Sequence, residues 1–253
     1  MIARPRRLSH GQEASLVEHL DELRSRVVVA GGAVLVGSIA GYAVHRPALK
    51  LLVSALPPGR RHLLTLGVVE PFTTSLKLSI AIGIALALPI VLWQVWAYFA
   101  PAVRPETTRG IGMFAAFAAV LLAFGVVFGD RIALPASLKF LTNYDQSVYD
   151  TQIRAADYLS FSVLVLAACG AVFELPIAVL GLVRVGALSS SRLRRNRRIG
   201  YFLVACVGVA LPGVDPVTTV VETIPLALLF EASIWLSVFF ERRWHPAPDP
   251  LVS

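Results

Sequence analysis

Two carboxylates in the polar parts of the sequence could bind guanidinium groups. Glu22 lies just before the first apolar run, and Glu106 lies in the polar segment that follows the second. One carboxylate can accept two parallel hydrogen bonds from an arginine, so two carboxylates at one surface could hold a pair of arginines. A local interpretation is also open, because Glu22 precedes Arg26 by four residues and would meet it as an ion pair on a helix.

Three further carboxylates and one amide lie inside apolar runs, where lipid is expected. They are Glu174, Glu222, Glu231 and Gln94. Ionisable side chains within a membrane carry a large free-energy cost and are functional candidates for that reason. Two interpretations stay open: the carboxyl groups are protonated or paired and only fix the packing, or they line a polar pocket. Prolines that bend three of the spans favour a pocket; these are Pro89, Pro176 and Pro225.

The sequence offers no residue set for making or breaking bonds. All five histidines, at positions 10, 19, 45, 62 and 245, lie outside the apolar cores. This excludes a bis-histidine haem span and the membrane anchor of a redox enzyme, and no glycine-rich phosphate loop occurs. Cys169 and Cys206 lie in apolar runs, and we expect small buried side chains there rather than a disulfide or metal site. We therefore expect neither an enzyme nor a cofactor.

The composition predicts that membrane helices position these groups. Of 253 residues, 56% are hydrophobic and only 15% are charged, with a mean hydropathy of +0.71, whereas soluble domains carry about 25% charged residues. The net charge of +7 requires no nucleic acid, because arginines that orient membrane helices explain it. Six continuous apolar runs occur, at 27–44, 72–99, 111–129, 159–182, 199–211 and 217–240. In the first run, Gly37 and Gly41 predict a close contact with another helix.

The fifth apolar run is too short for a full bilayer. Residues 199–211 would form about 20 Å of helix, against a hydrocarbon core of about 30 Å. The link at 212–216 is also short, so the fifth and sixth helices should form a tight hairpin that thins the bilayer. The expected fold is an all-α membrane protein with six transmembrane helices, of which the fifth and sixth are short. Bent helices around the buried Glu174 would give it a concave face.

The distribution of basic residues predicts the orientation. Most of the 23 lysines and arginines fall in segments on the side of both termini, which places both termini in the cytoplasm. We expect a cytoplasmic tail and amphipathic helix at 1–26, a transmembrane domain at 27–240 and a cytoplasmic tail at 241–253. Segment 47–56 is expected to form a helix along the outer membrane surface.

Several short motifs follow one another in order along the spans. They are His19-Leu-Asp-Glu22-Leu-Arg24-Ser-Arg26, Glu70-Pro71-Phe72, Trp93-Gln94-Val-Trp96, Phe124-Gly125-x-x-Phe128 with Pro135, Phe173-Glu174-Leu-Pro176, Asp215-Pro216, and Ile224-Pro225 to Phe230-Glu231. Each motif is weak alone. In this order and at this spacing, the sequence resembles the TatC family, the six-span receptor subunit of the twin-arginine protein translocase.

The resemblance implies a receptor in the cytoplasmic (inner) membrane for Arg-Arg signal peptides of folded precursor proteins. With TatA and TatB, such a receptor exports these precursors by use of the proton-motive force. It implies that Glu22 and Glu106 contact the twin arginines and that Arg24 belongs to the same surface. Glu174 corresponds to the buried acid of the concave face, and we group Gln94 with it.

The resemblance also implies partners at the last two helices. Asp215 corresponds to the aspartate of the outer hairpin, and we place Glu222 and Glu231 with it as docking residues for TatA and TatB type single-span subunits. Lipid and further copies of the same chain are the other expected partners. The sequence departs from the family pattern at Thr107, at Asp130, before Asp215 in the hairpin, and at Glu222.

A second function stays open at this point. A small proton-coupled secondary transporter could use Glu174 and Glu231 to carry the ion. Such transporters are often built from inverted repeats, and the sequence shows no internal repeat.

Overall fold

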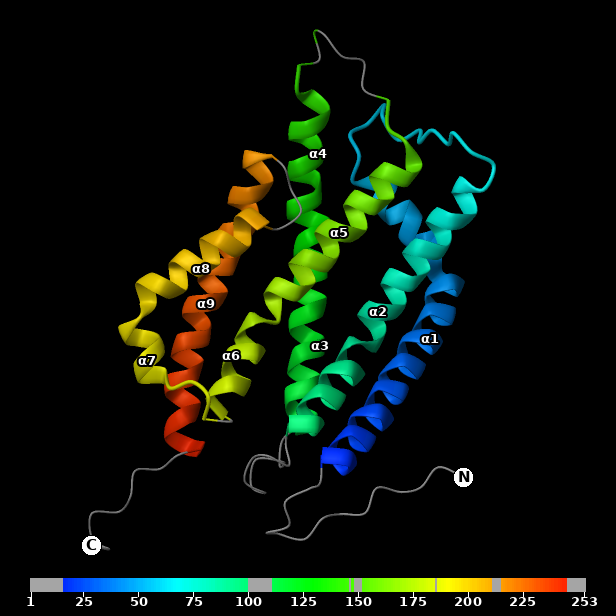
Figure 1. Cartoon of the computed structure of the whole chain (residues 1–253). Helices are drawn as coiled ribbons and strands as arrows, with labels where there is room; N and C mark the ends of the chain where they lie inside the picture. The colour runs from blue at the N-terminus through cyan, green and yellow to red at the C-terminus, as the bar shows by residue number, and fades with distance from the viewer. Residues whose placement is uncertain are drawn as a thin grey trace, which may run out of the picture.

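The described residues form a bundle of helices (Figure 1). The computed structural model describes residues 16–99, 111–145, 147, 152–184, 186–210 and 215–244. The helices are α1 (Leu16–Ser54), α2 (Glu70–Phe99), α3 (Ile111–Phe128), the π-helical segment η3 (Gly129–Ala133), α4 (Leu134–Asn143), α5 (Ala155–Phe173), α6 (Leu175–Arg184), α7 (Ser190–Arg195), α8 (Arg197–Ala210) and α9 (Pro216–Trp244). The expectation of an all-α membrane protein is confirmed.

Five helical stretches of the described chain are long and apolar enough to cross a membrane. They are Leu20–Ser54, Glu70–Val95, Ala115–Asn143, Ala155–Arg184 and Pro216–Glu241. The remaining predicted span, 199–211, corresponds to α8, which has 14 residues and extends about 21 Å. This is short of the bilayer core of about 30 Å. The described chain therefore contains five helices of full spanning length rather than six.

The expectation of a short sixth helix is wrong. Helix α9 has 29 residues and continues through Pro225. A proline removes one backbone donor and usually bends or ends a helix. Here α9 packs along α6 and α8, and such neighbours help a membrane helix tolerate the proline.

Two helices extend further than the apolar runs predicted. Helix α1 continues through Pro47 to Ser54, and α3, η3 and α4 follow one another without a break from 111 to 143. The predicted surface helix at 47–56 is therefore wrong. Leu52 and Leu56 are buried in the core, and the Tyr158 hydroxyl donates to the Leu52 carbonyl oxygen at 2.5 Å. These contacts hold the segment against the bundle instead of against lipid.

Helices α1 and α2 approach each other closely at small residues. A Cβ atom placed on Gly37 would lie 2.6 Å from the carbonyl oxygen of Gly83, and one on Gly41 would meet the carbonyl oxygen of Ser79. Only glycine permits backbones to approach this closely, as in other membrane helix pairs. The close contact predicted for Gly37 and Gly41 is confirmed.

The helices alternate in direction between two ends of the bundle. At one end, here called the terminal end, α1 begins, α2 ends and α9 ends (Figure 1). At the other, the hairpin end, α4 ends and both α5 and α9 begin. A buried apolar cluster near the middle of α9 comprises Val172, Val204, Leu226, Phe230 and Ile234.

Candidate functional site

The Glu22 carboxylate binds an arginine of its own helix. Arg26 donates to Glu22 Oε1 from Nε at 3.1 Å and from Nη2 at 2.5 Å. Its third nitrogen, Nη1, donates to Gln94 Oε1 on α2 at 3.3 Å. The Arg26 and Glu22 side chains are 22% and 31% exposed. The three residues therefore form a half-buried polar cluster at the terminal end of α1 and α2.

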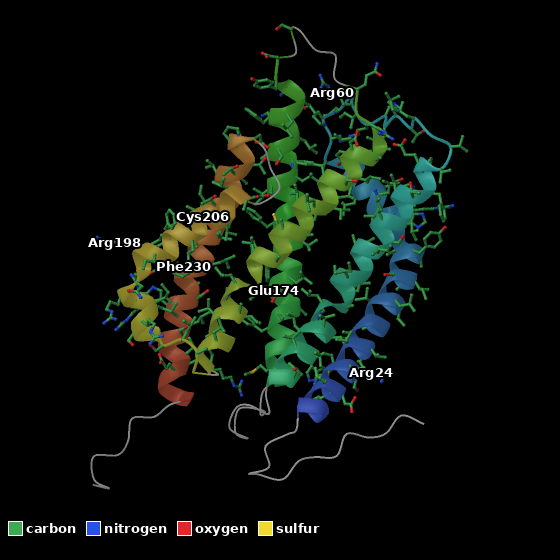
Figure 2. The ribbon with its side chains drawn as sticks, in the orientation of Figure 1. Arg24, Arg60, Glu174, Arg198, Cys206 and Phe230 are labelled. Carbon is green, nitrogen blue, oxygen red and sulfur yellow. The ribbon has the colours of Figure 1, made fainter. Side chains whose placement is uncertain are left out.

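The structure of this cluster can be compared with the sequence predictions for Glu22, Gln94 and Arg24. The local ion pair between Glu22 and Arg26 is confirmed. Gln94 contacts Arg26 because the last turns of α2 lie beside the first turns of α1. The Arg24 side chain is exposed at the same end of the bundle (Figure 2). Glu106 lies outside the described residues.

Glu174 lies at the junction of α5 and α6, about midway between the two ends of the bundle (Figure 2). Helix α5 ends at Phe173 and α6 begins at Leu175, so the helical break predicted from Pro176 is present. Both carboxyl oxygens are shielded from solvent, and neither has a hydrogen-bond partner among the described residues. An unpartnered buried carboxyl group is costly and is retained most readily where it serves binding.

Asp215 caps the first turn of α9. The Thr218 backbone N–H donates to Asp215 Oδ1 at 2.8 Å, and the Thr218 hydroxyl donates to Asp215 Oδ2. The same hydroxyl lies 2.5 Å from Ser137 Oγ on α4. Asp215 is only 2% exposed, so its carboxylate binds within the fold and joins the start of α9 to α4.

We expect Asp215→Ala to lower the free energy of unfolding by about 2 kcal/mol, the upper part of the range for lost helix caps. The substitution removes the acceptor of a buried backbone N–H and of the Thr218 hydroxyl. Thermal unfolding in detergent would measure the effect. Asp157→Ala is the matched control, because Asp157 lies in the first turn of α5 but is exposed. Equal losses in the two variants would contradict the capping role.

Glu231 joins α9 to α8. Its Oε1 lies 3.0 Å from Arg197 Nη2, and its Oε2 accepts a hydrogen bond from the Tyr201 hydroxyl at 2.9 Å. The Arg197 guanidinium also lies 5.9 Å from the ring centroid of Trp235, within the range of a cation–π contact. Both oxygens of Glu231 are therefore occupied, and the side chain holds the short helix α8 against α9.

Glu222 differs from the other acids of α9 in having no partner. It is 3% exposed, and neither carboxyl oxygen has a hydrogen-bond partner in the described part of the chain. The sequence marked Glu222 as a departure from the family pattern and grouped it with possible docking residues. Its burial shows that it faces the interior of the bundle.

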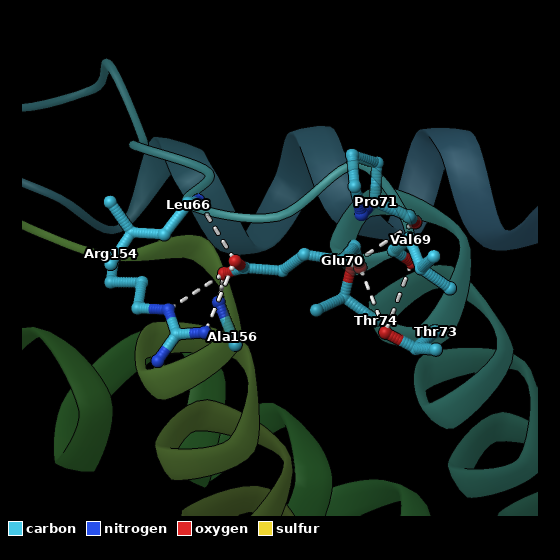
Figure 3. Close-up of polar contacts among 8 residues, drawn as sticks. All are labelled: Leu66, Val69, Glu70, Pro71, Thr73, Thr74, Arg154 and Ala156. Atoms are coloured by element: carbon cyan, nitrogen blue, oxygen red, sulfur yellow. Dashed lines mark hydrogen bonds and ion pairs between the residues drawn. The ribbon is translucent and has the colours of Figure 1, made fainter.

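Sequence reasoning missed an ion pair at the hairpin end. Glu70, the first residue of α2, accepts hydrogen bonds from Arg154 Nε at 3.1 Å and Nη2 at 3.2 Å (Figure 3). It also accepts from the backbone N–H of Leu66 at 2.9 Å and of Ala156 at 3.1 Å. Glu70 raises the pKa of Arg154 above its ordinary value, chiefly through their hydrogen bond.

Backbone hydrogen bonds extend this contact. The Leu64 N–H donates to the Ile153 carbonyl at 2.9 Å, and the Ala155 N–H donates to the Leu64 carbonyl at 2.8 Å. Together with Glu70 these bonds fasten the α1–α2 connection to the start of α5. In the sequence, Glu70 belongs to one of the short motifs. Arg154 is one of the basic residues in a segment predicted to lie on the outer side of the membrane. The only local signal was the acidic residue at the first position of a helix.

The described residues provide several polar groups suited to binding. The described residues contain no group of three or more His, Cys, Asp or Glu side chains suited to a metal ion. What they provide is a carboxylate that holds a guanidinium at the terminal end, two buried unpartnered carboxyl groups, and a short helix beside long ones.

Comparison with known proteins identifies the family. The model of the family described as "Sec-independent protein translocase protein (TatC)" matches residues 18–225. The TatC protein of Carboxydothermus hydrogenoformans is 31% identical over 230 residues, which cover 90% of this chain and 95% of that protein. TatCd of Bacillus subtilis is 32% identical over 238 residues, which cover 92% and 95%.

A solved structure has the same fold. The crystal structure of the twin-arginine translocase receptor TatC in DDM superposes with a TM-score of 0.75 at 30% identity, and covers 87% of this chain and 99% of that chain. The family resemblance drawn from the motifs is therefore confirmed. With a family match over most of its length and relatives above 30% identity along nearly the whole chain, this protein belongs to the TatC family of Sec-independent protein translocase components.

Proposed function

We propose that this protein is the membrane receptor for Arg-Arg signal peptides of folded precursor proteins. With TatA and TatB type single-span subunits, it exports these precursors across the cytoplasmic membrane by use of the proton-motive force. Its membership of the translocase family supports the proposal. So does its likeness to a solved protein that is itself described as a twin-arginine translocase receptor.

One observation carries the proposal: Glu22 already binds a guanidinium. Both hydrogen bonds that Arg26 donates to Glu22 end on Oε1, and within the described part of the chain Oε2 is left to accept from a second donor. The Glu22 side chain is 31% exposed and can be reached from outside the bundle. A partly exposed ion pair contributes only about 0–1 kcal/mol. An arginine of a signal peptide could therefore replace Arg26 or share Glu22 with it at little cost.

Glu106 is proposed as the second carboxylate, so that each arginine of the pair meets one acid. A guanidinium forms a planar fork with carboxylates, whereas a lysine ammonium does not. This geometry supports a preference for arginine over lysine. The exposed Arg24 at the same end would contact an acidic or backbone group of the bound peptide.

Two further features support deeper contacts and partner docking. The unpartnered carboxyl group of Glu174 could accept a hydrogen bond from an inserted signal peptide. The short α8 has a row of exposed apolar side chains that faces lipid or a partner: Phe202, Leu203, Val207 and Val209. A helix of this length thins the bilayer beside it, which favours docking of a single-span subunit at α8 and α9. Asp215 and Glu231 would contribute by holding these two helices in place.

The proposed orientation has both termini in the cytoplasm. The start of α1 and the end of α9 lie at the same end of the bundle (Figure 1), which requires an even number of crossings. Five helices span the membrane by length, and α8 would complete the sixth crossing where the bilayer is thin.

Direct binding to the purified protein tests the proposal. We expect an Arg-Arg signal peptide to bind more tightly than its Lys-Lys counterpart, by about 1.5–3 kcal/mol, the usual range for hydrogen bonds to charged groups. This preference should be lost in the variant that combines Glu22→Gln with Glu106→Gln, since a neutral amide lacks the charge of a carboxylate and offers a guanidinium only one acceptor oxygen. Fluorescence anisotropy with labelled peptides would measure both affinities.

Glu231→Gln serves as the control, because Glu231 lies on α9 and already binds Arg197 and Tyr201. It should keep the preference for arginine. Equal binding of the two peptides to the unmodified protein, or an unchanged preference in the Glu22/Glu106 variant, would refute the proposal.

A further inference from the structure

Glu222 is a buried acid for which the proposed function has no use. It lies on α9, which packs against α4, η3, α5, α6 and α8, and 3% of its surface is exposed. Both carboxyl oxygens are shielded from solvent and lack a hydrogen-bond partner among the described residues. An ionised carboxylate in this setting would lose its hydration without gaining a compensating partner.

The groups around Glu222 do not neutralise it. Among the described residues, Glu222 interacts electrostatically with the thiol of Cys169 on α5 and with the carboxylate of Asp215, which directly precedes α9. On η3, Asp130 lies 3.3 Å from its neighbour Arg131. On α4, the buried Ser137 is bound to Thr218, and the basic residue of α6, Arg184, lies in the last turn of that helix. On α8, Tyr201 is bound to Glu231. None of these groups donates a hydrogen bond to the Glu222 carboxyl group.

Buried polar side chains adjoin Glu222 on the side of the hairpin end. Asp215, Thr218 and Glu222 follow one another at spacings of three and four, so they lie on one face of α9. This row covers about 10.5 Å of helix from the hairpin end. Beyond Glu222 the same face continues with Leu226 and Phe230, which belong to the buried apolar cluster. Along α9, the polar groups of Asp215 and Thr218 therefore lie between Glu222 and the hairpin end, whereas the apolar side chains of Leu226 and Phe230 lie between Glu222 and the terminal end.

We propose that Glu222 is a proton-binding site of the bundle and that it exchanges its proton with the hairpin end. The site stands apart from the Glu22 cluster at the terminal end and does not depend on the binding of signal peptides. The proton binds to one carboxyl oxygen and leaves as the carboxylate forms, so no other reactant is needed.

Labelling with dicyclohexylcarbodiimide tests the proton-binding site. This apolar reagent reacts with protonated carboxyl groups: the acid adds across one C=N bond, its proton passes to nitrogen, and rearrangement gives a stable N-acylurea. In the purified full-length protein we expect labelling of the peptide that contains Glu222, with a yield that falls as pH rises. Glu222→Gln should abolish the label on this peptide. Mass spectrometry of the digested protein would distinguish it from any label on Glu174.

Glu231→Gln is the matched control, because both oxygens of Glu231 are occupied on the same helix. It should leave the labelling at position 222 unchanged. Absence of label at Glu222 at every pH, or labelling that does not vary with pH, would overturn the proposal.

The direction of exchange is tested in vesicles of known orientation with different pH on the two sides. We expect the yield at Glu222 to follow the pH on the hairpin side. A yield that follows the pH on the terminal side would overturn the direction of exchange, and it would do so without any bearing on signal-peptide binding.

Discussion

The substitution Gly37→Leu is expected to push α1 away from α2 and to lower the free energy of unfolding by about 3 kcal/mol. The backbones of the two helices nearly touch at this point. A Cβ atom on Gly37 would already lie 2.6 Å from the Gly83 carbonyl oxygen, and a leucine adds three more carbon atoms. The neighbour is backbone within a helix, so a change of side-chain rotamer cannot relieve the clash. Thermal unfolding in detergent would measure the loss.

Gly32→Leu is the matched control on the same helix. A Cβ atom at Gly32 meets no atom within 4 Å, and leucine forms helix more readily than glycine by about 1 kcal/mol. The control should therefore be neutral or slightly stabilising. Since both variants gain the same helix propensity, the difference between them isolates the contact with α2. Equal stability of the two variants would show that the close approach of α1 and α2 does not determine the packing.

Features that depend on neighbouring residues were predictable from the sequence. Continuous apolar runs indicated the long helices, and the length of the run at 199–211 indicated that α8 is short. The Glu22–Arg26 pair follows from a spacing of four on a helix. The spacing of Gly37 and Gly41 predicted a close helix contact, although not that Ser79 and Gly83 would be its partners. In each case the signal lies within one continuous stretch of the chain.

Features that depend on distant residues were not predictable in the same way. Helices α1 and α4 extend past the apolar runs because tertiary contacts bury their last turns, as with Leu52 and Leu138. Hydropathy alone therefore placed their ends too early. Gln94 and Arg26 are 68 residues apart, and no local pattern connects them. Whether a polar side chain such as Glu222 faces lipid or the interior also depends on which helices pack around it.

The sequence did not predict the contact between Glu70 and Arg154, two residues that are 84 positions apart. We expect Glu70→Gln to release the α1–α2 connection from the start of α5. The amide keeps the shape of the side chain but loses the charge that binds the guanidinium, and only one of its two heavy atoms can accept hydrogen bonds. The backbone N–H groups of Leu66 and Ala156 then compete for a single acceptor. Hydrogen exchange followed by mass spectrometry should show faster exchange in the peptides that contain these two residues.

A double-mutant cycle separates the ion pair from the backbone contacts. Arg154→Gln alone should speed exchange less than Glu70→Gln, because the Glu70 carboxylate would still accept from both backbone N–H groups. The double variant should differ little from Glu70→Gln, since residues in one hydrogen-bonded network do not contribute additively. Additive effects of the two substitutions would show that Glu70 and Arg154 act independently. In that case the bonds of Leu64 to Ile153 and Ala155, rather than the ion pair, would hold the connection in place.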